Sequence, residues 1–583
     1  MIVSVEILIV LLLFVAAAVL LATELIPLEV TALCLVVVLS ATGIITAQEA
    51  FQGFASEAIV VLACVMILSR RLADSGAMLG LSARLVGQGK SAPVGVGPRL
   101  MAGSAVLSML FSNTSTTAVM MPVAIGAARK AKHDPARYLM PIAFASIMGG
   151  SATLIGTSTN LAVSGAIARA GLEPFGLFEF FWVGVTVSVA GIAAMVLLGR
   201  RLVPVRGETK DLEEGGALFL AGLVVAPGSR AEGMTVSELG LADIDVTLLA
   251  IDTEDARLEP HPRRKLHEGN HIIIRATAAA LASLLDDKRF VVDGIAEATQ
   301  VQVTAEAILL PGSQWVGMSL ARMRRELSPD VAVIGVRRSG YGRVARIGLM
   351  RLRAGDILHL VGEEDGIARV DADVDIYLAT DAEPVAPGRR EGWYTLSALL
   401  GAIAIAAAGV LPLSVALTMA VLGLVLAGRF TLRDAFAMVS WRVLILIGGM
   451  SSFGLAMLQT GAADWLAQGI FQHIVPLGRP AVLVSLSLLT VLLTQPLSNA
   501  AAALTMLPIA IALADTLGVD PRPLAIIVTL SASLSFIAPL EPALLLVYGK
   551  GNYRLMDFVR AGVPLTLISM AVVLVLVPWL WPF

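Results

Sequence analysis

The feature that most constrains the fold is a pair of apolar blocks, residues 1–205 and 391–583, which enclose a polar stretch. Each block holds apolar spans long enough for helices that cross a bilayer, which need about 20 such residues. Charged residues make up 15% of the chain, whereas about 25% is usual in soluble domains. In residues 206–390 the apolar runs shrink to strand length, as in Leu218–Ala226 and Val246–Ile251. The chain is therefore predicted to be an all-α polytopic membrane protein with a soluble insert.

The two apolar blocks repeat each other. "ELIPLEV" around Pro27 corresponds to "GVLPLSV" around Pro412, 385 positions later. "SNTSTTAVMMP" from Ser112 corresponds to "SNAAAALTMLP" from Ser498, 386 positions later. Repeats in membrane transporters often have inverted topology, with the binding site at the interface between them. Two inverted repeats, 1–205 and 391–583, are therefore expected.

Basic residues predict the orientation, because positive charge is enriched on the cytoplasmic side of a membrane. Both flanks of the first Ser-Asn element are basic, through Arg84, Lys90, Arg99, Arg129, Lys130, Lys132 and Arg137. The second element is flanked by Arg479 on one side and by Asp515, Asp520 and Arg522 on the other. We expect two re-entrant hairpins, the first opening inward and the second outward. Arg200, Arg201 and Arg206 then place the insert in the cytoplasm.

A re-entrant hairpin turns inside the bilayer, where its backbone groups need polar partners. Ser112, Asn113, Ser498 and Asn499 supply short polar side chains at these turns. Carbonyl and hydroxyl oxygens can ligate a hard cation such as sodium. Amide and backbone N–H groups at helix N-termini can bind an anion. The alternative is that Ser-Asn only caps a helix within the bundle.

A second polar element follows each hairpin. In the first block it is "GGSATLIGTSTNL", Gly149–Leu161, which is typical of a broken helix inside a membrane. In the second block it is Ser535–Tyr553, where Pro539 and Pro542 interrupt the helix and Glu541 adds a carboxylate. A carboxylate within a membrane is costly and marks a functional site by default.

These motifs, with the ending "LVYGKGNYRLMDFVRAGVPL", resemble the divalent anion–sodium symporter family, the solute carrier family 13 type. The resemblance covers both apolar blocks. It implies transport of sulfate or of di- and tricarboxylates, an elevator movement and a homodimer. The implied substrate-binding residues are Ser112, Asn113, Thr114, Thr157, Ser498 and Asn499. The implied sodium ligands are Ser112, Asn113, Gly156, Asn160, Ser498 and Asn499.

The second block departs from the family pattern. Ala500 stands where the motif has Thr, and the second break lacks the Gly and Asn of the first. A second sodium site is therefore in doubt. Glu541 could carry a proton in place of that ion, because desolvation favours the neutral form of a carboxyl group. The alternative is a fixed negative charge paired with an arginine.

The insert is itself duplicated. "APGSRAEGMTVSEL" from Ala226 corresponds to "LPGSQWVGMSLARM" from Leu310, which predicts modules at 206–298 and 299–390. Each copy is predicted to contain a strand, a Pro-Gly-Ser turn, a short helix and further strands. The modules resemble the RCK-C or TrkA-C type, although no G-x-G-x-x-G nucleotide-binding loop follows a strand. The resemblance implies dimerisation, and a small-molecule or nucleotide regulator is an alternative to a passive clamp.

We therefore predict a secondary active transporter of a small anion in the inner cell membrane, driven by sodium, protons or both. The nearest alternative is an anion exporter or sodium/proton antiporter on the same fold. An RCK-gated channel is a third, against which the chain has no T-V-G-Y-G filter. No nucleophile–base set indicates an enzyme, and no cofactor other than the coupling sodium ion is expected. The net charge of −3 gives no indication of nucleic-acid binding.

Overall fold

The computed structural model describes residues 4–582 with gaps at 24–25, 76–94, 132, 204–217, 227, 242–245, 253–256, 259–260, 278–279, 282, 285–288, 293–302, 311–312, 314, 328–330, 339–349, 363–366, 368–369, 371–375, 380–388 and 552. Several residues used for the sequence predictions lie outside the described part: Arg84, Lys90, Lys132, Arg206, and Pro227 and Pro311 of the two Pro-Gly-Ser turns.

The chain forms two compact units. The helical unit comprises Met1–Pro204, Ala386–Val547 and Leu555–Phe583. The second unit comprises Val205–Val385 together with Tyr548–Arg554. This unit covers most of the predicted insert, 206–390. The short segment Tyr548–Arg554, which sequence reasoning assigned to the second repeat, belongs to this unit instead.

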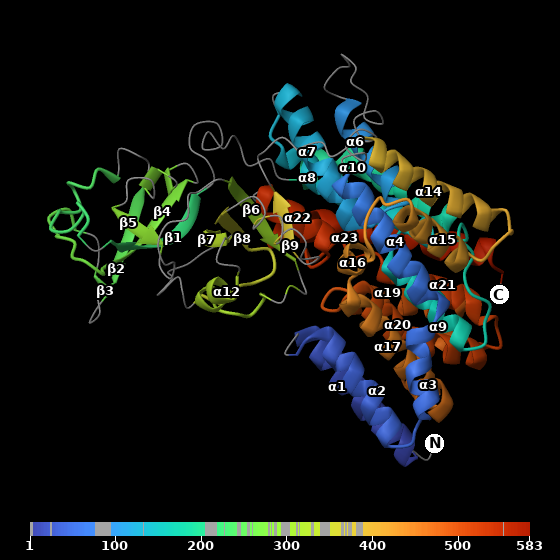
Figure 1. The fold of residues 1–583 in the computed structure, drawn as a ribbon. Coiled ribbons are helices and arrows are strands. Elements are labelled where there is room, and N and C mark those ends of the chain that lie inside the picture. Colours follow the sequence, from blue (N-terminus) through green and yellow to red (C-terminus); the bar gives the residue numbers. More distant parts are fainter. Residues whose placement is uncertain are drawn as a thin grey trace. The chain divides into compact units, whose positions relative to one another are not determined.

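The first half of the helical unit, blue to cyan in Figure 1, has a helix order that the second half repeats. Its helices are α1 (Val5–Thr23), α2 (Leu28–Ala41), α3 (Ala47–Gln52), α4 (Glu57–Asp74), α6 (Val96–Ser108), α7 (Asn113–Ala131), α8 (Ala136–Gly150), α9 (Ser158–Arg169) and α10 (Phe181–Leu202). The second half has α14 (Arg389–Ala407), α15 (Leu413–Leu426), α16 (Leu432–Ala437), α17 (Trp441–Thr460), α18 (Ala462–Phe471), α19 (Arg479–Leu493), α20 (Asn499–Leu517), α21 (Pro521–Ala532), α22 (Pro542–Lys550) and α23 (Leu555–Leu580).

The residues that start and interrupt helices also occur at corresponding positions of the two halves. Both α2 and α15 have 14 residues and follow a proline, Pro27 or Pro412, at the N-cap. Both α3 and α16 begin with a capping box, in which a threonine side chain and an acidic side chain satisfy each other's backbone N–H groups. Both α7 and α20 have 19 residues, with Pro122 and Pro508 at the tenth position. The two halves therefore share helix lengths and N-terminal signals at corresponding positions.

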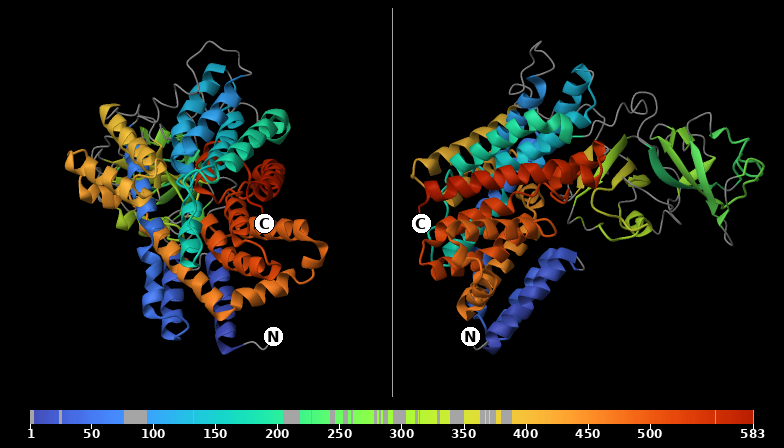
Figure 2. Two further views of the ribbon diagram at one scale, coloured as in Figure 1. Left: turned by 90° about the vertical axis from the view of Figure 1, so that its right-hand side faces the viewer. Right: turned by 180° about the vertical axis from the view of Figure 1, so that it is seen from behind.

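Helices of each half also pack against helices of the other half. In the first half α2 packs on α17 of the second, and α15 packs in the same way on α4. Within each half, α6 and α7 pack on α8 as α19 and α20 pack on α21. Figure 2 shows α1 and α2 as an adjacent pair, and α14 and α15 pair likewise. These reciprocal contacts bury one face of each half against the other.

Five helical segments in the described part are long and apolar enough to cross a membrane by length and composition: Ala47–Ala73, Phe181–Gly199, Trp441–Thr460, Asn499–Leu517 and Leu555–Leu580. Shorter apolar helices accompany them in both halves. This composition agrees with the predicted polytopic membrane protein.

The second unit is built on one nine-stranded sheet, to which both predicted modules contribute strands. Its strands are β1 (Leu218–Val225), β2 (Thr247–Asp252), β3 (Arg257–Leu258), β4 (His271–Thr277), β5 (Phe290–Val292), β6 (Val303–Leu309), β7 (Val331–Arg337), β8 (Ile357–Gly362) and β9 (Ile376–Ala379). The strand order is β3-β2-β4-β1-β7-β8-β6-β9, and β5 pairs with β1. The order β2-β4-β1 in the first module matches β7-β8-β6 in the second, and β1 pairs with β7 to join them.

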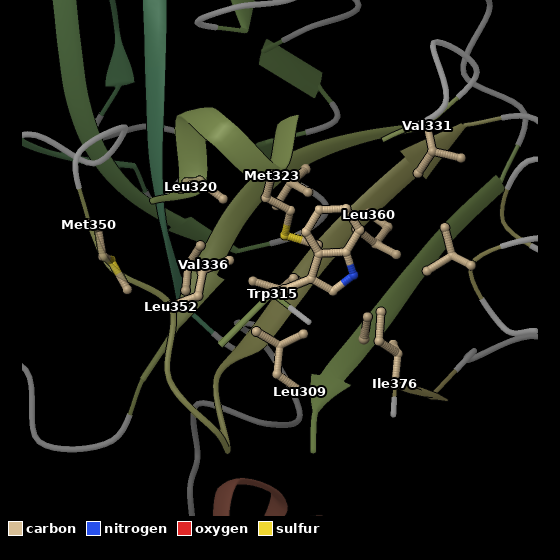
Figure 3. Packing of buried hydrophobic residues seen from close by; sticks show 14 of the residues in the cluster. Leu309, Trp315, Leu320, Met323, Val331, Val336, Met350, Leu352, Leu360 and Ile376 are labelled. Carbon is tan, nitrogen blue, oxygen red and sulfur yellow. The ribbon is translucent and has the colours of Figure 1, made fainter. Parts of the chain in front are cut away.

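The duplication extends to single contacts. The isolated bridge Thr235↔Lys265 in the first module corresponds to Ser319↔Arg351 in the second. The predicted short helix is present in the second module as α12 (Leu320–Glu326), whereas residues 236–240 of the first form turns. Figure 3 shows the core of the second module, where the buried Trp315 packs among aliphatic side chains such as Leu360.

Candidate ion and substrate site

Each Ser-Asn pair lies at the start of the longer helix of a hairpin, α7 or α20. The serines face outward and cap these helices: Ser112 Oγ accepts the backbone N–H of Ser115 at 3.2 Å, and Ser498 Oγ accepts that of Ala501 at 3.3 Å. Both serines are exposed. Helix capping, the alternative considered from the sequence, thus describes what the two serine side chains do in this structure.

The asparagines turn the other way. Asn113 Oδ1 accepts a hydrogen bond from Ser108 Oγ at 3.0 Å, and Asn499 Oδ1 accepts one from Thr494 Oγ1 at 2.8 Å. In both hairpins the hydroxyl donor stands five residues before the asparagine. With their oxygens turned to these hydroxyls, the two amides have their NH2 groups available for other acceptors.

The two NH2 groups meet at one carboxylate. Asn113 Nδ2 donates to Glu541 Oε1 at 3.4 Å, and Asn499 Nδ2 donates to Glu541 Oε2 at 3.1 Å. The Glu541 carbonyl accepts the N–H groups of Leu544 and Leu545, so the residue begins α22. A carboxylate is favourable at that end of a helix, where the helix dipole is positive. Among the described residues, no lysine or arginine forms an ion pair with Glu541.

The first break, between α8 and α9, is held by hydroxyl and amide groups. Thr157 caps α9 by accepting the N–H of Asn160 at 3.1 Å, and the N–H of Gly156 is donated to Thr153 Oγ1 at 3.1 Å. Asn160 is fully buried. Its Nδ2 donates to the Thr153 carbonyl at 2.8 Å, while its Oδ1 has no hydrogen-bond partner.

Glycine is required where the first break meets the first hairpin. A Cβ atom on Gly150 would lie 2.1 Å from Asn113 Oδ1, and one on Gly156 would lie 2.3 Å from the Gly150 carbonyl oxygen. Any larger residue would displace the Asn113 amide or open the break. The glycines of the Gly-Gly and Gly-Thr pairs in "GGSATLIGTSTNL" therefore have a packing reason.

The second break lacks the polar side chains that the first break has at corresponding positions. Leu544, Leu545 and Leu546 cover every position that corresponds to Asn160 at an offset of 384 to 386, and all three are buried. Thr114 follows Asn113 and is half-buried, whereas the corresponding Ala500 is apolar and buried. Glu541 is consequently the polar side chain that the second break contributes to both asparagines.

The structure therefore brings Asn113, Asn499 and Glu541 together and packs the Gly150–Gly156 turn against Asn113. Ser108 and Thr494 were missed from the sequence, although the signal was there: both are hydroxyl residues at equivalent positions of the repeat. Gln495 was missed as well, and its Oε1 accepts the N–H of Ala538 in the second break at 3.1 Å. Within the described residues, no group of three His, Cys, Asp or Glu side chains could hold a metal ion.

Residues 18–531 match the CitMHS family, described as citrate transporter. The chain belongs to this family. Over 576 residues it is 28% identical to an uncharacterized transporter of Synechocystis sp., in a match that covers 95% of this chain and 93% of that protein. It is 30% identical over 137 residues to solute carrier family 13 member 2 of Oryctolagus cuniculus and to the Na+/citrate cotransporter of Rattus norvegicus. Each of these shorter matches covers 23% of this chain and 23% of the relative.

These similarities confirm the coarser predictions. The matched family is described as a citrate transporter, one relative is named a Na+/citrate cotransporter and another a transporter, which supports an anion transporter. The apolar helices of the described part agree with a multi-pass membrane protein. The CitMHS match runs through both helical halves and the insert between them, since it extends from residue 18 to residue 531.

Proposed function

We propose that this member of the citrate transporter family is a secondary active transporter that moves a small anion, of the sulfate or di- and tricarboxylate class, by an elevator movement. The observation that carries the proposal is the convergence of Asn113 and Asn499, from equivalent hairpins, on Glu541. A site formed jointly by two repeats is the arrangement expected of an inverted-repeat transporter. The two hairpins then enter the membrane from opposite sides, and the insert is cytoplasmic.

In this proposal the anion and Glu541 compete for the same two donors. The amide NH2 groups of Asn113 and Asn499 are what an anion would need, and Glu541 occupies both. An anion bound beside an ionised Glu541 would meet a like charge in a medium of low dielectric constant, which is strongly unfavourable. Protonation of Glu541 removes that repulsion. Anion binding and proton uptake are therefore coupled.

A sodium ion fits the first half. The buried amide oxygen of Asn160 accepts no hydrogen bond, and a buried polar atom without a partner requires an explanation, such as a bound ion. Amide and carbonyl oxygens are suitable ligands for a hard cation. Asn113 Oδ1 and the Gly156 carbonyl both lie against Gly150 in the same turn. The leucines at the positions equivalent to Asn160 leave the second half without such an oxygen. We therefore propose one sodium site, with Glu541 as the proton site in the other half.

The test is radiolabelled uptake into proteoliposomes. Sulfate, succinate and citrate are offered with and without a sodium gradient, and with and without an inward proton gradient. Uptake of one anion that needs one or both gradients supports the proposal. Uptake that is unaffected by either gradient would exclude secondary active transport.

A sodium/proton antiporter on the same fold is the second candidate, because Glu541 has no basic partner among the described residues and could exchange a proton for sodium. In the same vesicles, sodium-driven proton movement without any anion would favour that function.

A further inference from the structure

One cluster in the second unit is not used by the proposed transport mechanism. Lys550, the last residue of α22, contacts Glu306 Oε2 on β6 through its ammonium group. Both side chains are largely buried, with exposed fractions of 22% for Lys550 and 13% for Glu306. A largely buried charged group is stabilised there by an oppositely charged partner, and Glu306 supplies that partner for Lys550.

The surroundings of Glu306 strengthen this pairing. Arg337 on β7 places Nη2 3.6 Å from Glu306 Oε2, and its guanidinium lies 5.4 Å from the centre of the Phe219 ring on β1. Burial alone would raise the pKa of Glu306, but Lys550 and then Arg337 lower it below the ordinary value. The carboxylate therefore stays ionised at neutral pH and keeps its attraction for Lys550.

The segment that carries Lys550 is part of the second unit. Tyr548–Arg554 belongs to that unit, although α22 begins in the helical one. The N–H of Tyr553 is donated to the Tyr548 carbonyl at 3.2 Å, which closes a turn, and the Tyr553 side chain is buried. A Cβ atom on Gly551 would lie 2.1 Å from the Tyr553 ring, so this turn needs glycine.

α22 connects this turn directly to the candidate site. Glu541 accepts the first hydrogen bonds of α22, and Lys550 ends it nine residues later. At about 1.5 Å per residue, the two side chains stand at opposite ends of a helix roughly 14 Å long. Ala543–Val547 between them are buried. A short helix packed along its length transmits a displacement of one end to the other.

We infer that Lys550 is a positioning residue for transport: its ion pair with Glu306 fixes the end of α22 and so sets where Glu541 stands between Asn113 and Asn499. The inference rests on the proposed role of Glu541. It gives the duplicated insert a defined task, since any ligand or assembly that moves β6 or β7 would change the affinity of the site for its anion.

The test compares Lys550→Met, Lys550→Arg and Glu306→Gln with wild type, and uses the exposed Arg560→Met as a control for loss of a basic residue near the last helix. Sulfate uptake is measured against substrate concentration and pH at equal amounts of folded protein. We expect Lys550→Met and Glu306→Gln each to raise KM roughly five- to tenfold and to shift the pH profile, with the double variant no worse than either. Lys550→Arg should restore most of the affinity, and Arg560→Met should match wild type.

The decisive comparison is made in a Glu541→Gln background. If Lys550 acts through Glu541, Lys550→Met adds little to the effect of Glu541→Gln on KM and none on pH dependence. A wild-type KM and pH profile in Lys550→Met, or an undiminished effect of Lys550→Met in the Glu541→Gln background, would overturn the inference and leave the proposed transport function standing. If Glu541→Gln itself behaves like wild type, both the role of Glu541 and the positioning role fall together.

Discussion

Asn113 and Asn499, 386 positions apart, donate their amide N–H groups to opposite oxygens of one carboxylate, at 3.4 and 3.1 Å. Each amide is oriented by a hydroxyl five residues earlier, Ser108 or Thr494. Neither half of the chain can form this arrangement alone. The carboxylate comes from the break of the second half, so the site is symmetric in its donors and asymmetric in its acceptor.

Replacing either asparagine by alanine should impair transport severely and leave the fold intact. Each substitution removes one of the two amide donors and leaves one Glu541 carboxylate oxygen without that hydrogen bond. An unsatisfied buried polar group costs about 1–3 kcal/mol, which corresponds to a roughly 5- to 150-fold loss of affinity. Uptake kinetics of Asn113→Ala and Asn499→Ala in proteoliposomes measure the effect.

Ser112→Ala is the matched control, because the Ser112 side chain caps α7 at an exposed position and does not reach Glu541. It should cost stability of about 1 kcal/mol and little affinity. If Asn499→Ala transports with wild-type KM, the second hairpin tip is structural only.

Sodium dependence should reside in Asn160. Asn160→Leu copies the residue type of the second break and removes the buried oxygen that lacks a donor. The sodium concentration for half-maximal uptake should rise at least about tenfold, because a missing oxygen ligand is not replaced by an alkyl group. Leu546→Met, a volume-conserving change at one of the three positions that correspond to Asn160, should leave the sodium requirement unchanged. An unaltered sodium response in Asn160→Leu would remove this residue from the cation site.

Much of this arrangement could be predicted from the sequence. The paired Ser-Asn motifs, the two breaks and Glu541 are all visible as polar residues in apolar surroundings, and the repeat offset ties them together. What the sequence could not supply is the direction of the side chains. Ser112 and Ser498 are next to the asparagines in the chain, yet they turn outward to cap helices, because the first turn of a helix leaves N–H groups that need acceptors.

Long-range contacts were the other limit. Nothing near Lys550 in the chain indicates its partner Glu306, 244 positions earlier. Among the described residues, the short helix expected in both modules is seen in the second, where Ser319 caps it by accepting the N–H of Arg322. Such differences between copies depend on local packing rather than on the shared pattern.

Removing residues 210–385 and joining the halves with a flexible linker should leave a protein that still inserts in the membrane. The helical unit buries its own core and contains the apolar spans of both halves. Transport should persist at lower affinity, as in Lys550→Met, because Glu306 is removed with the insert. Membrane fractionation and sulfate uptake check both parts. Complete failure to insert would show that the insert is needed for folding of the helical unit.

The pH dependence of transport should depend on Glu541. If anion binding requires a protonated Glu541, each binding event takes up a proton, and affinity falls as pH rises above the range in which the free site is protonated. The limiting slope is about tenfold in KM per pH unit for one proton. Sulfate is the suitable probe, because it stays a dianion throughout the neutral range and contributes no titration of its own.

Glu541→Gln should abolish that slope. The glutamine amide cannot take up a proton, and it offers one acceptor oxygen where the carboxylate offers two, so sulfate binding should persist with a changed but pH-independent KM. A proton gradient should then no longer drive accumulation. Glu541→Asp keeps a titratable group and should retain a pH slope even if the shorter side chain weakens binding. Parallel pH profiles for wild type and Glu541→Gln would exclude Glu541 as the proton carrier and would favour a permanently charged carboxylate that only orients Asn113 and Asn499.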